Sequence, residues 1–534
     1  MSNSKTLKRT MWIILAIITA GIGLNKFSHN ELYPSDNIRD QLVRFNEVFA
    51  YINQFYVEKP NNEEIITGAI EGMLSELDPH SVYIPKKSVD RMNEQFEGSF
   101  EGIGIEFVVL EKILTVVAPI VGGPSEAVGI LPGDQIIKIE EKSAYGITEN
   151  EVQKKLRGPK GSKVKVTIRR PDQGNEEFDV TIVRDKIPIY SVTASFMMED
   201  GETGYIYLGR FAKKTSEELE DALVTLERQG MKRLVLDLRG NSGGYLDQAF
   251  AVSDKFVPGG QKIVYTRGRL KNTGSDYYST DKGTHPLYPL IVMIDHGSAS
   301  ASEIVAGAIQ DLDRGLVVGQ TSFGKGLVQN QIPLRDGSAL RLTIARYYTP
   351  SGRLIQRPYD KGIVDYYAGA YDDSSNLSKV DSSKLYFTLS GRKVFGGGGI
   401  TPDIDLESEK ITRFTFQLRA KRVFFEYGSK YSGNFKSWKR EFKKFKNNFK
   451  ITSVMLNDLK NIITKHDIEF NQEAYDKDLD YIKLLMKAEI ARHLWDSEHF
   501  YMIRIMADSE VLKAKEYFLK AKEIAMLNKW GEHL

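Results

Sequence analysis

An apolar run at residues 290–294 passes through a turn of small residues directly into a helical pattern that begins at Ala301. A strand that enters a helix through so tight a turn exposes the turn residue at the carboxyl end of a sheet. Similar segments recur around it: strands at residues 204–208, 234–238, 316–318 and 340–347, and a helix at 216–228. This alternation predicts an α/β domain with a largely buried sheet.

The rest of the chain follows other patterns. Residues 37–77 have the apolar spacing of two amphipathic helices, and Asp78-Pro79 ends the second, because proline cannot continue a helix. Short strands separated by turns then form a β module, and a helical region rich in Lys, Phe and Tyr closes the chain. We therefore expect a multidomain α/β plus α protein. Its predicted parts are an export segment (1–30), a helical N-terminal domain (31–95), the β module (96–186), the α/β domain (187–404) and a helical C-terminal domain (405–534).

The start of the chain indicates export. Lys5, Lys8 and Arg9 precede an uncharged apolar run at residues 11–24. That run is shorter than the ~20 residues of a full span, and no A-x-A cleavage site follows, so a cleaved signal peptide and an uncleaved anchor both stay open. A buried helix of a cytosolic protein is the alternative. We expect a protein of the periplasm or cell envelope, held in the inner membrane if residues 11–24 are retained.

Composition excludes several classes of function. The chain has 73 basic and 71 acidic residues, so no global field draws it toward nucleic acid. Cysteine is absent, which rules out thiolate nucleophiles, thiolate metal sites, disulfides and a lipidated cysteine. Residues 436–450 are basic and interleaved with aromatics, but acidic residues return from Asp467 onward, so we interpret them as a solvated helical face and expect no nucleic-acid partner.

The turn before the helix offers a nucleophile. Ser300 lies where the helix starts, and the unpaired N–H of Ala301 there is suited to stabilise an oxyanion. The glycine-rich turn that follows residues 234–238 offers a second backbone donor at Gly243 or Gly244. No lysine follows that turn at P-loop spacing, which argues against a phosphate cradle.

A serine nucleophile needs a base within hydrogen-bond reach. His296 and Asp295 would make a triad with Ser300, but so short a connection leaves little freedom to align three side chains. Lys325 lies between two glycines that permit close packing, and a desolvated lysine loses its proton near neutral pH. Gln329 is placed to orient its amine. We favour Lys325 as the base.

Gly-Ser-Ala-Ser-Ala-Ser-Glu, followed by Phe-Gly-Lys-Gly and a Gln four residues beyond the Lys, resembles the carboxyl-terminal processing peptidases, or tail-specific proteases. Lys325 follows Ser300 by 25 positions, which is that family's spacing. The resemblance covers about residues 40 to 405. It implies a crotonase- or ClpP-like catalytic domain with Ser300 as nucleophile, Lys325 as general base and Gln329 as orienting partner, and with no metal or organic cofactor. The motifs Leu77-Asp78-Pro79-His80-Ser81 and Gly399-Ile400-Thr401-Pro402-Asp403 agree with it.

The β module resembles PDZ domains through Gly102-Ile103-Gly104-Ile105, Pro132-Gly133-Asp134 and Arg157-Gly158-Pro159. Consecutive N–H groups in the first motif are suited to hold a chain-terminal carboxylate, and the following strand edge to accept a peptide. We expect Ile103 and Ile105 to line an apolar pocket for the last side chain. The resemblance further implies that Arg157 couples peptide occupancy to the active site, unless it is only a structural ion-pair partner.

The sequence therefore predicts an exported serine endopeptidase that binds polypeptide tails with apolar ends and cuts them with a Ser/Lys dyad. The membrane is a partner if the N-terminal segment is retained, and a second copy of the chain or an adaptor protein stays open as a partner. One rival is a catalytically silent PDZ scaffold. Another is an acyl-CoA enzyme, in which a serine with a lysine base would have no purpose.

Overall fold

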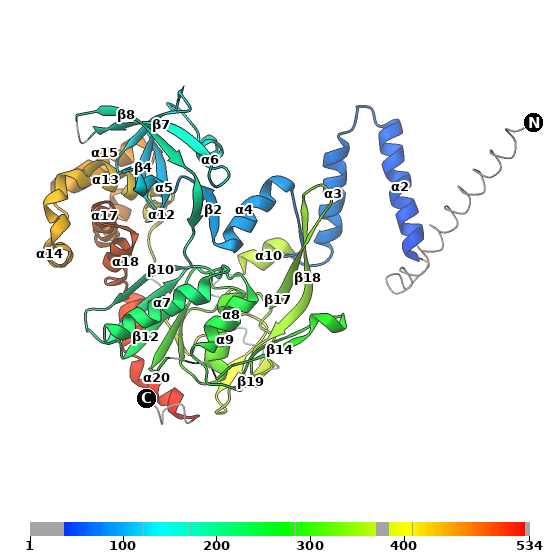
Figure 1. The fold of residues 1–534 in the computed structure, drawn as a ribbon. Helices are drawn as coiled ribbons and strands as arrows, with labels where there is room; N and C mark the ends of the chain where they lie inside the picture. Colours follow the sequence, from blue (N-terminus) through cyan, green and yellow to red (C-terminus); the bar gives the residue numbers. More distant parts are fainter. Residues whose placement is uncertain are drawn as a thin grey trace, which may run out of the picture. The chain divides into compact units, whose positions relative to one another are not determined.

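The computed structural model describes residues 37–528 except 121, 172–173, 282, 284, 370–383 and 408–409 (Figure 1). Contacts divide the chain into two units, residues 1–77 and 78–534. In the first unit the structure describes helices α2 (Asn37–Phe55) and α3 (Asn62–Ser75), which confirms the two predicted helices. The Asn61 side chain accepts a hydrogen bond from the Glu64 amide and so caps α3.

The second unit includes a sheet with the strand order β3-β4-β5-β7-β8, with β6 paired to β5. Its elements are β3 (Ile105–Leu110), β4 (Ile113–Pro119), α5 (Pro124–Ala127), β5 (Gln135–Ile139), β6 (Lys142–Ser143), α6 (Glu149–Leu156), β7 (Lys163–Arg170) and β8 (Glu176–Val183). Helix α6 begins with a capping box between Thr148 and Glu151. Strand β3 lies at the edge of the sheet, so one side of its backbone is unpaired within the described residues.

The central sheet of the α/β domain has the order β10-β11-β12-β15-β16-β21, parallel except for β10. Its strands are β10 (Val192–Met197), β11 (Thr203–Leu208), β12 (Arg233–Asp237), β15 (Leu290–Ile294), β16 (Leu316–Gly319) and β21 (Ile404–Asp405). One face packs on helices α7 (Thr215–Arg228), α8 (Leu246–Asp254) and α9 (Ala301–Asp311) through side chains such as Leu236 and Val292. The predicted α/β domain is confirmed.

A second sheet has the strand order β1-β18-β13-β14, with β17 paired to β18 (Figure 1). Its strands are β1 (Val82–Ile84), β13 (Lys262–Arg267), β14 (Ser275–Tyr278), β17 (Leu327–Pro333) and β18 (Ala339–Tyr348). Helix α4 (Lys86–Glu97) and the pair β2 (Ser99–Gly102) and β9 (Asp185–Pro188) connect this region to the β module. Helix α10 (Ile363–Ala368) and the hairpin β19 (Leu385–Phe387) and β20 (Lys393–Phe395) follow β18.

The C-terminal region is helical, as predicted. It comprises α12 (Arg413–Ala420), α13 (Val423–Tyr431), η4 (Ser432–Arg440), α14 (Phe442–Asn448), α15 (Ser453–Lys465), α16 (Gln472–Lys477), α17 (Leu479–Leu494), α18 (Ser497–Ile505), α19 (Ser509–Lys515) and α20 (Phe518–Met526). Helices α12 to α18 share a core of their own, in which the aromatic side chains Phe445 and Phe449 of the basic stretch are buried.

Helices α19 and α20 do not belong to that core. Val511 and Phe518 pack against Val235, Ile291 and Met293 on the face of the central sheet opposite α7, α8 and α9. The parallel strands are therefore buried on both faces, as such sheets require. The end of the chain completes the core of the α/β domain.

Candidate active site

Ser300 lies at the first turn of α9, just beyond the carboxyl end of β15. Its backbone has φ +56° and ψ −111°, a sparsely populated conformation for a residue other than glycine. Such a bend between strand and helix presents a side chain at the edge of the sheet. Ser300 lines a cleft of about 980 Å³ together with Lys325, Gln329 and Ala299.

The glycine-rich turn after β12 reaches this serine. A Cβ atom at Gly243 would lie 2.8 Å from Ser300 Cβ and 2.9 Å from the Ala301 nitrogen, and the φ of Gly243 is +97°. Only glycine fits there without displacing the serine. The Gly243 amide itself donates to Asn241 Oδ1 over 2.9 Å.

Gly244 is better oriented to donate. Phe211 donates to the Gly243 carbonyl and accepts from the Tyr245 amide, as in a parallel bridge between Phe211 and Gly244. In that pattern the N–H of Gly244 points away from Phe211, and Gly244 lines the cleft. Of the two predicted glycine donors, the geometry therefore favours Gly244 over Gly243, because the Gly243 amide is already bonded.

Lys325 enters the same cleft from the segment before β17. Burial, together with the positive charge of Arg341, lowers the pKa of the Lys325 amine to about 8. Its Nζ donates to Gln329 Oε1 over 2.8 Å. The predicted pairing of Lys325 with Gln329 is present, and the lysine titrates near neutral pH.

The Gln329 amide is held from its other side. Its Nε2 donates to the carbonyl oxygen of His80. Asp78 holds the turn that carries this carbonyl, because its carboxylate accepts from the amides of His80 (2.9 Å) and Ser81 (3.0 Å). Burial and nearby Lys325 lower the pKa of His80 to about 4, so His80 is neutral. The sequence assigned the Asp-Pro-His-Ser motif the end of a helix but no part in the site; the structure shows that it positions the partner of the lysine.

Glu303 joins the two candidate residues, and the sequence did not single it out. This fully buried carboxylate accepts from the amides of Ser300 (2.7 Å) and Lys325 (2.9 Å) on one oxygen. Its other oxygen accepts from Gly324 N (2.7 Å) and Ser322 Oγ (2.6 Å). Burial raises the pKa of Glu303, but each hydrogen bond that it makes with the described residues comes from a donor, so we assign the ionised form. In the sequence, the Ser-x-x-Glu spacing of a capping box was the local signal for the contact between Glu303 and the Ser300 amide.

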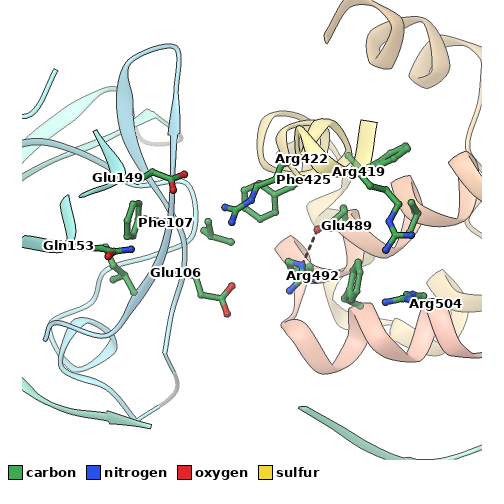
Figure 2. A pocket seen from close by; sticks show the side chains of 15 residues that line it. Glu106, Phe107, Glu149, Gln153, Arg419, Arg422, Phe425, Glu489, Arg492 and Arg504 are labelled. Atoms are coloured by element: carbon green, nitrogen blue, oxygen red, sulfur yellow. Dashed lines mark hydrogen bonds and ion pairs between the residues drawn. The ribbon is translucent and has the colours of Figure 1, made fainter. Parts of the chain in front are cut away.

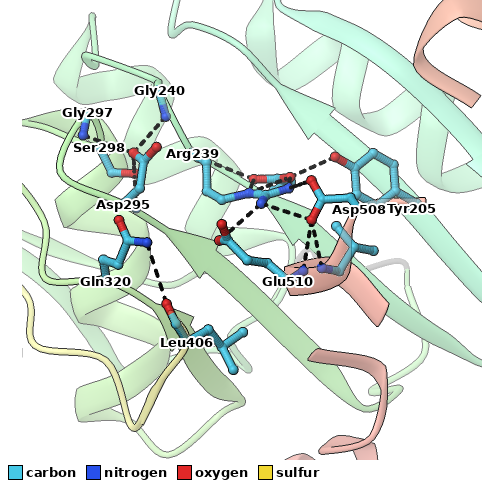
Figure 3. A network of polar contacts seen from close by, with 12 residues as sticks. Tyr205, Arg239, Gly240, Asp295, Gly297, Ser298, Gln320, Leu406, Asp508 and Glu510 are labelled. Carbon is cyan, nitrogen blue, oxygen red and sulfur yellow. Dashed lines mark hydrogen bonds and ion pairs between the residues drawn. The ribbon is translucent and has the colours of Figure 1, made fainter. Parts of the chain in front are cut away.

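Asp295, the carboxylate of the alternative triad, holds backbone amides instead of orienting His296. Asp295 Oδ1 accepts from the amides of Gly240 (2.8 Å) and Gly297 (2.9 Å), and Figure 3 shows it bracing these turns. Among the described residues, no hydrogen bond or ion pair joins Asp295 to the His296 side chain, which lines the cleft. This agrees with the preference for Lys325 as base.

Arg157 of the β module contacts a helix that lines the cleft. Its guanidinium forms an ion pair with Glu94 of α4 and lies 4.6 Å from the centroid of the Phe100 ring. On the same helix, Asn93 accepts from Gln331 of β17 over 3.2 Å. Helix α4 therefore lies between Arg157 and the strand that carries Gln329.

The Gly-Ile-Gly-Ile motif runs from the end of β2 into β3. Gly104 has φ +72°, and a Cβ there would lie 2.9 Å from Ile187 Cδ1, so the bend requires glycine. Ile105 lines a groove next to β3. Ile103, in contrast, is 2% exposed in the core of the β module, so its side chain does not line the groove as expected.

Arg239, at the start of the glycine-rich turn, forms ion pairs with residues of the C-terminal region. Arg239 is bonded to Asp237 and also to Asp508 (3.0 Å) and Glu510 (3.1 Å) around α19 (Figure 3). Tyr205 donates to Asp237 Oδ2 over 2.7 Å. Burial acts to lower the pKa of Arg239, but the nearby carboxylates outweigh it and raise that pKa above its usual value, so the guanidinium remains charged.

Removing the arginine leaves three carboxylates without their counterion. We expect Arg239→Leu to destabilise the protein by about 3 to 5 kcal/mol, since an unpaired buried charge is strongly unfavourable, and to lower kcat/KM by loosening the Gly243–Gly244 turn. Urea denaturation and peptidase assays measure the two effects. Arg228→Leu, at an exposed position of α7, serves as the control and should change stability by less than about 0.5 kcal/mol. Equal stability of both variants would contradict a stabilising role for the network.

Taken together, these features define a serine peptidase domain with an attached PDZ domain. Sequence profiles agree: Peptidase family S41 matches residues 202–365, the PDZ domain 102–182, the activating protease CtpB N-terminal domain 21–88, and a family of unknown function 414–496. The chain belongs to the carboxy-terminal processing proteases of peptidase family S41.

Its similarity to curated relatives extends over most of their length. The carboxy-terminal-processing protease of Bartonella bacilliformis is 42% identical over 324 residues, 60% of this chain and 74% of that protein. The carboxy-terminal processing proteases CtpA and CtpB of Bacillus subtilis are 36% and 39% identical, over 64% and 62% of this chain and 72% and 68% of their own.

Proposed function

We propose that this peptidase is an exported endopeptidase that binds polypeptide C-termini with apolar ends through its PDZ domain and cleaves the same chain with a Ser300/Lys325 dyad. The observation that carries the dyad is the placement of Lys325. Its amine is enclosed, is bonded to Gln329 and has a pKa near 8, and one oxygen of Glu303 joins its backbone to that of Ser300.

In the proposed mechanism, Ser300 Oγ attacks the scissile carbonyl carbon while its proton passes to the neutral Lys325 Nζ. The N–H groups of Ala301 and Gly244 stabilise the oxyanion. The C–N bond then breaks, and the leaving amine takes the proton from Nζ. A water molecule attacks the acyl-enzyme and gives a proton to Lys325 Nζ. The bond between Ser300 Oγ and the acyl carbon then breaks, Oγ takes that proton back from Nζ, and the product leaves with a free carboxyl group.

Arg157 is the proposed link between peptide occupancy and chemistry. It follows α6 directly and pairs with Glu94 on a helix that lines the cleft, so a shift of α6 would reach that helix through one ion pair. Arg157→Gln should leave cleavage of a peptide without a tail unchanged but remove the stimulation by an added tail peptide. Unchanged stimulation would assign Arg157 a purely structural role.

The proposed base predicts a pH profile. Only the neutral amine accepts a proton, so kcat/KM should rise with pH through about 8, the pKa of Lys325. Arg341 lowers that pKa by like-charge repulsion. Arg341→Met should therefore raise the Lys325 pKa and move the rising limb to higher pH. Arg346→Met, an exposed position on the same strand, is the matched control and should leave the limb in place.

Export is proposed from the N-terminal sequence. The basic residues and the apolar run at residues 11–24 lie outside the described residues. Across the part of the chain that the structure describes, we find no helix with the length and hydropathy to span a bilayer. Cell fractionation and N-terminal sequencing of the mature protein test the proposal, and recovery of the intact chain from the cytosol alone would overturn it.

The function as a whole is tested by incubating the protein without residues 1–30 with an unfolded polypeptide that ends in apolar residues. We expect cleavage by the parent and none by Ser300→Ala. A polypeptide with an amidated, charged end is the control for tail recognition and should be cut more slowly. Absence of cleavage by both proteins would support the silent scaffold instead.

A further inference from the structure

A groove of about 530 Å³ lies between the PDZ domain and the C-terminal helices. Figure 2 shows Phe107 of β3 and Glu149 and Gln153 of α6 on one wall. The opposite wall belongs to helices α12, α13, α17 and α18. An ion pair between Lys465 of α15 and Glu111 (2.9 Å), just beyond the end of β3, joins the two sides. The groove is thus a cavity with walls from two domains.

The PDZ wall has the features of a peptide site. Strand β3 is at the edge of its sheet, so it can pair with an added strand. Ile105 and Phe107 alternate on β3 and line the groove with apolar surface. A peptide that pairs with β3 would place alternate side chains on its two faces, since the side-chain period of a strand is two.

The opposite wall is basic. Arg419, Arg422 and Arg504 line the groove, and none of them forms an ion pair among the described residues. Arg492, the fourth arginine, is already paired with the buried Glu489 (2.9 Å). Arg422 has φ +55°, unusual for a residue other than glycine, at the junction of α12 and α13. Three guanidinium groups with no ion-pair partner in the described part of the chain therefore line the groove that β3 also lines.

Glu106 and Glu149 on the PDZ wall do not neutralise these arginines in the structure, because no ion pair crosses the groove among the residues described. Guanidinium groups bind carboxylates in preference to other side chains, often through two hydrogen bonds. The arginine wall is therefore complementary to a peptide that carries acidic side chains.

We propose that the PDZ domain and the C-terminal helices form one composite site for a polypeptide tail whose apolar side chains face β3 and α6 and whose acidic side chains face Arg419, Arg422 and Arg504. This rests on the proposed function and adds to it the substrate class: tails in which acidic residues alternate with apolar ones before the apolar end. The C-terminal helices then select substrates as well as completing the catalytic core.

The test measures peptide binding to residues 31–534 of the Ser300→Ala variant, with fluorescence anisotropy as the readout. Three labelled peptides share an apolar last residue and an apolar third-from-last residue. They differ only at the second- and fourth-from-last positions, which carry Glu, Gln or Lys. We expect the Glu peptide to bind about tenfold more tightly than the Gln peptide, as two partly enclosed charge pairs allow. The Lys peptide should bind most weakly, and the preference should shrink as salt is added.

The arginines are tested by the triple variant Arg419→Gln, Arg422→Gln and Arg504→Gln. It should lose the preference for Glu over Gln while it binds the Gln peptide as the parent does. Lys513→Gln combined with Lys520→Glu, at exposed positions of α19 and α20, lowers the net charge by the same three units and should retain the preference. Equal binding of the Glu and Gln peptides to the parent would overturn the proposal. So would an equal loss of both peptides in the triple variant with unchanged melting temperature.

Failure here is distinguishable from failure of the proposed function. Binding is measured in a chain that lacks the nucleophile, whereas the dyad is judged by cleavage of an unfolded polypeptide. If the protein cleaves the polypeptide through Ser300 but binds the Glu and Gln peptides equally, the proposed function stands and only the composite site is refuted.

Discussion

Ser300→Ala and Lys325→Ala should each lower kcat/KM by about four orders of magnitude or more, because nucleophile and base act as one unit. The double variant should have a kcat/KM no lower than that of either single variant. Cleavage of a quenched fluorescent polypeptide measures the loss, and circular dichroism verifies folding. Lys325 is enclosed beside Gln329 and has a pKa near 8, so an exposed lysine, which is protonated at neutral pH, cannot replace it as the base.

Ser275→Ala and Lys393→Ala make the same chemical changes at exposed positions and should leave kcat/KM as in the parent. If Lys325→Ala retained activity with the pH profile of the parent, the base would have to be another group. His296 would then be the first to replace, because it lines the same cleft.

Glu303→Gln should strongly lower kcat/KM and destabilise the protein by about 3 to 5 kcal/mol. The fully buried carboxylate accepts from Ser300, Lys325, Gly324 and Ser322, and an amide would direct its own N–H groups at some of these donors. The segments that carry the nucleophile and the base would then lose their common acceptor. Urea denaturation and kcat/KM together measure the effect.

A pH profile separates positioning from simple loss of stability. The negative charge of Glu303 raises the pKa of Lys325, so its removal should lower that pKa and move any residual activity to lower pH. This shift is opposite to the one expected for Arg341→Met. A control at an exposed glutamate of the C-terminal helices, Glu523→Gln, should change neither stability nor profile. Parental activity in Glu303→Gln would refute the positioning role.

Local signals in the sequence were sufficient to predict the order of the domains and the candidate dyad. Strands and helices have periods of two and 3.6 residues, so residues 290–294 and the helix after Ser300 could be assigned from their own side chains. The same holds for Lys325 and Gln329, which lie four residues apart and are hydrogen-bonded in the structure. The family resemblance rested on motifs of this local kind.

Other features depend on segments far apart in the chain. The contacts of Glu303 with Gly324 and Lys325 arise because a loop folds back onto α9. The packing of the β module places the Ile103 side chain in the core and the Ile105 side chain in the groove. The sequence pattern predicted that residues 405–534 are helical, but it did not predict which parts of the protein these helices pack against. Tertiary packing decided that α19 and α20 cover the central sheet and that the arginines of α12 to α18 face β3, because an amphipathic helix specifies that one face is buried and not the surface that buries it.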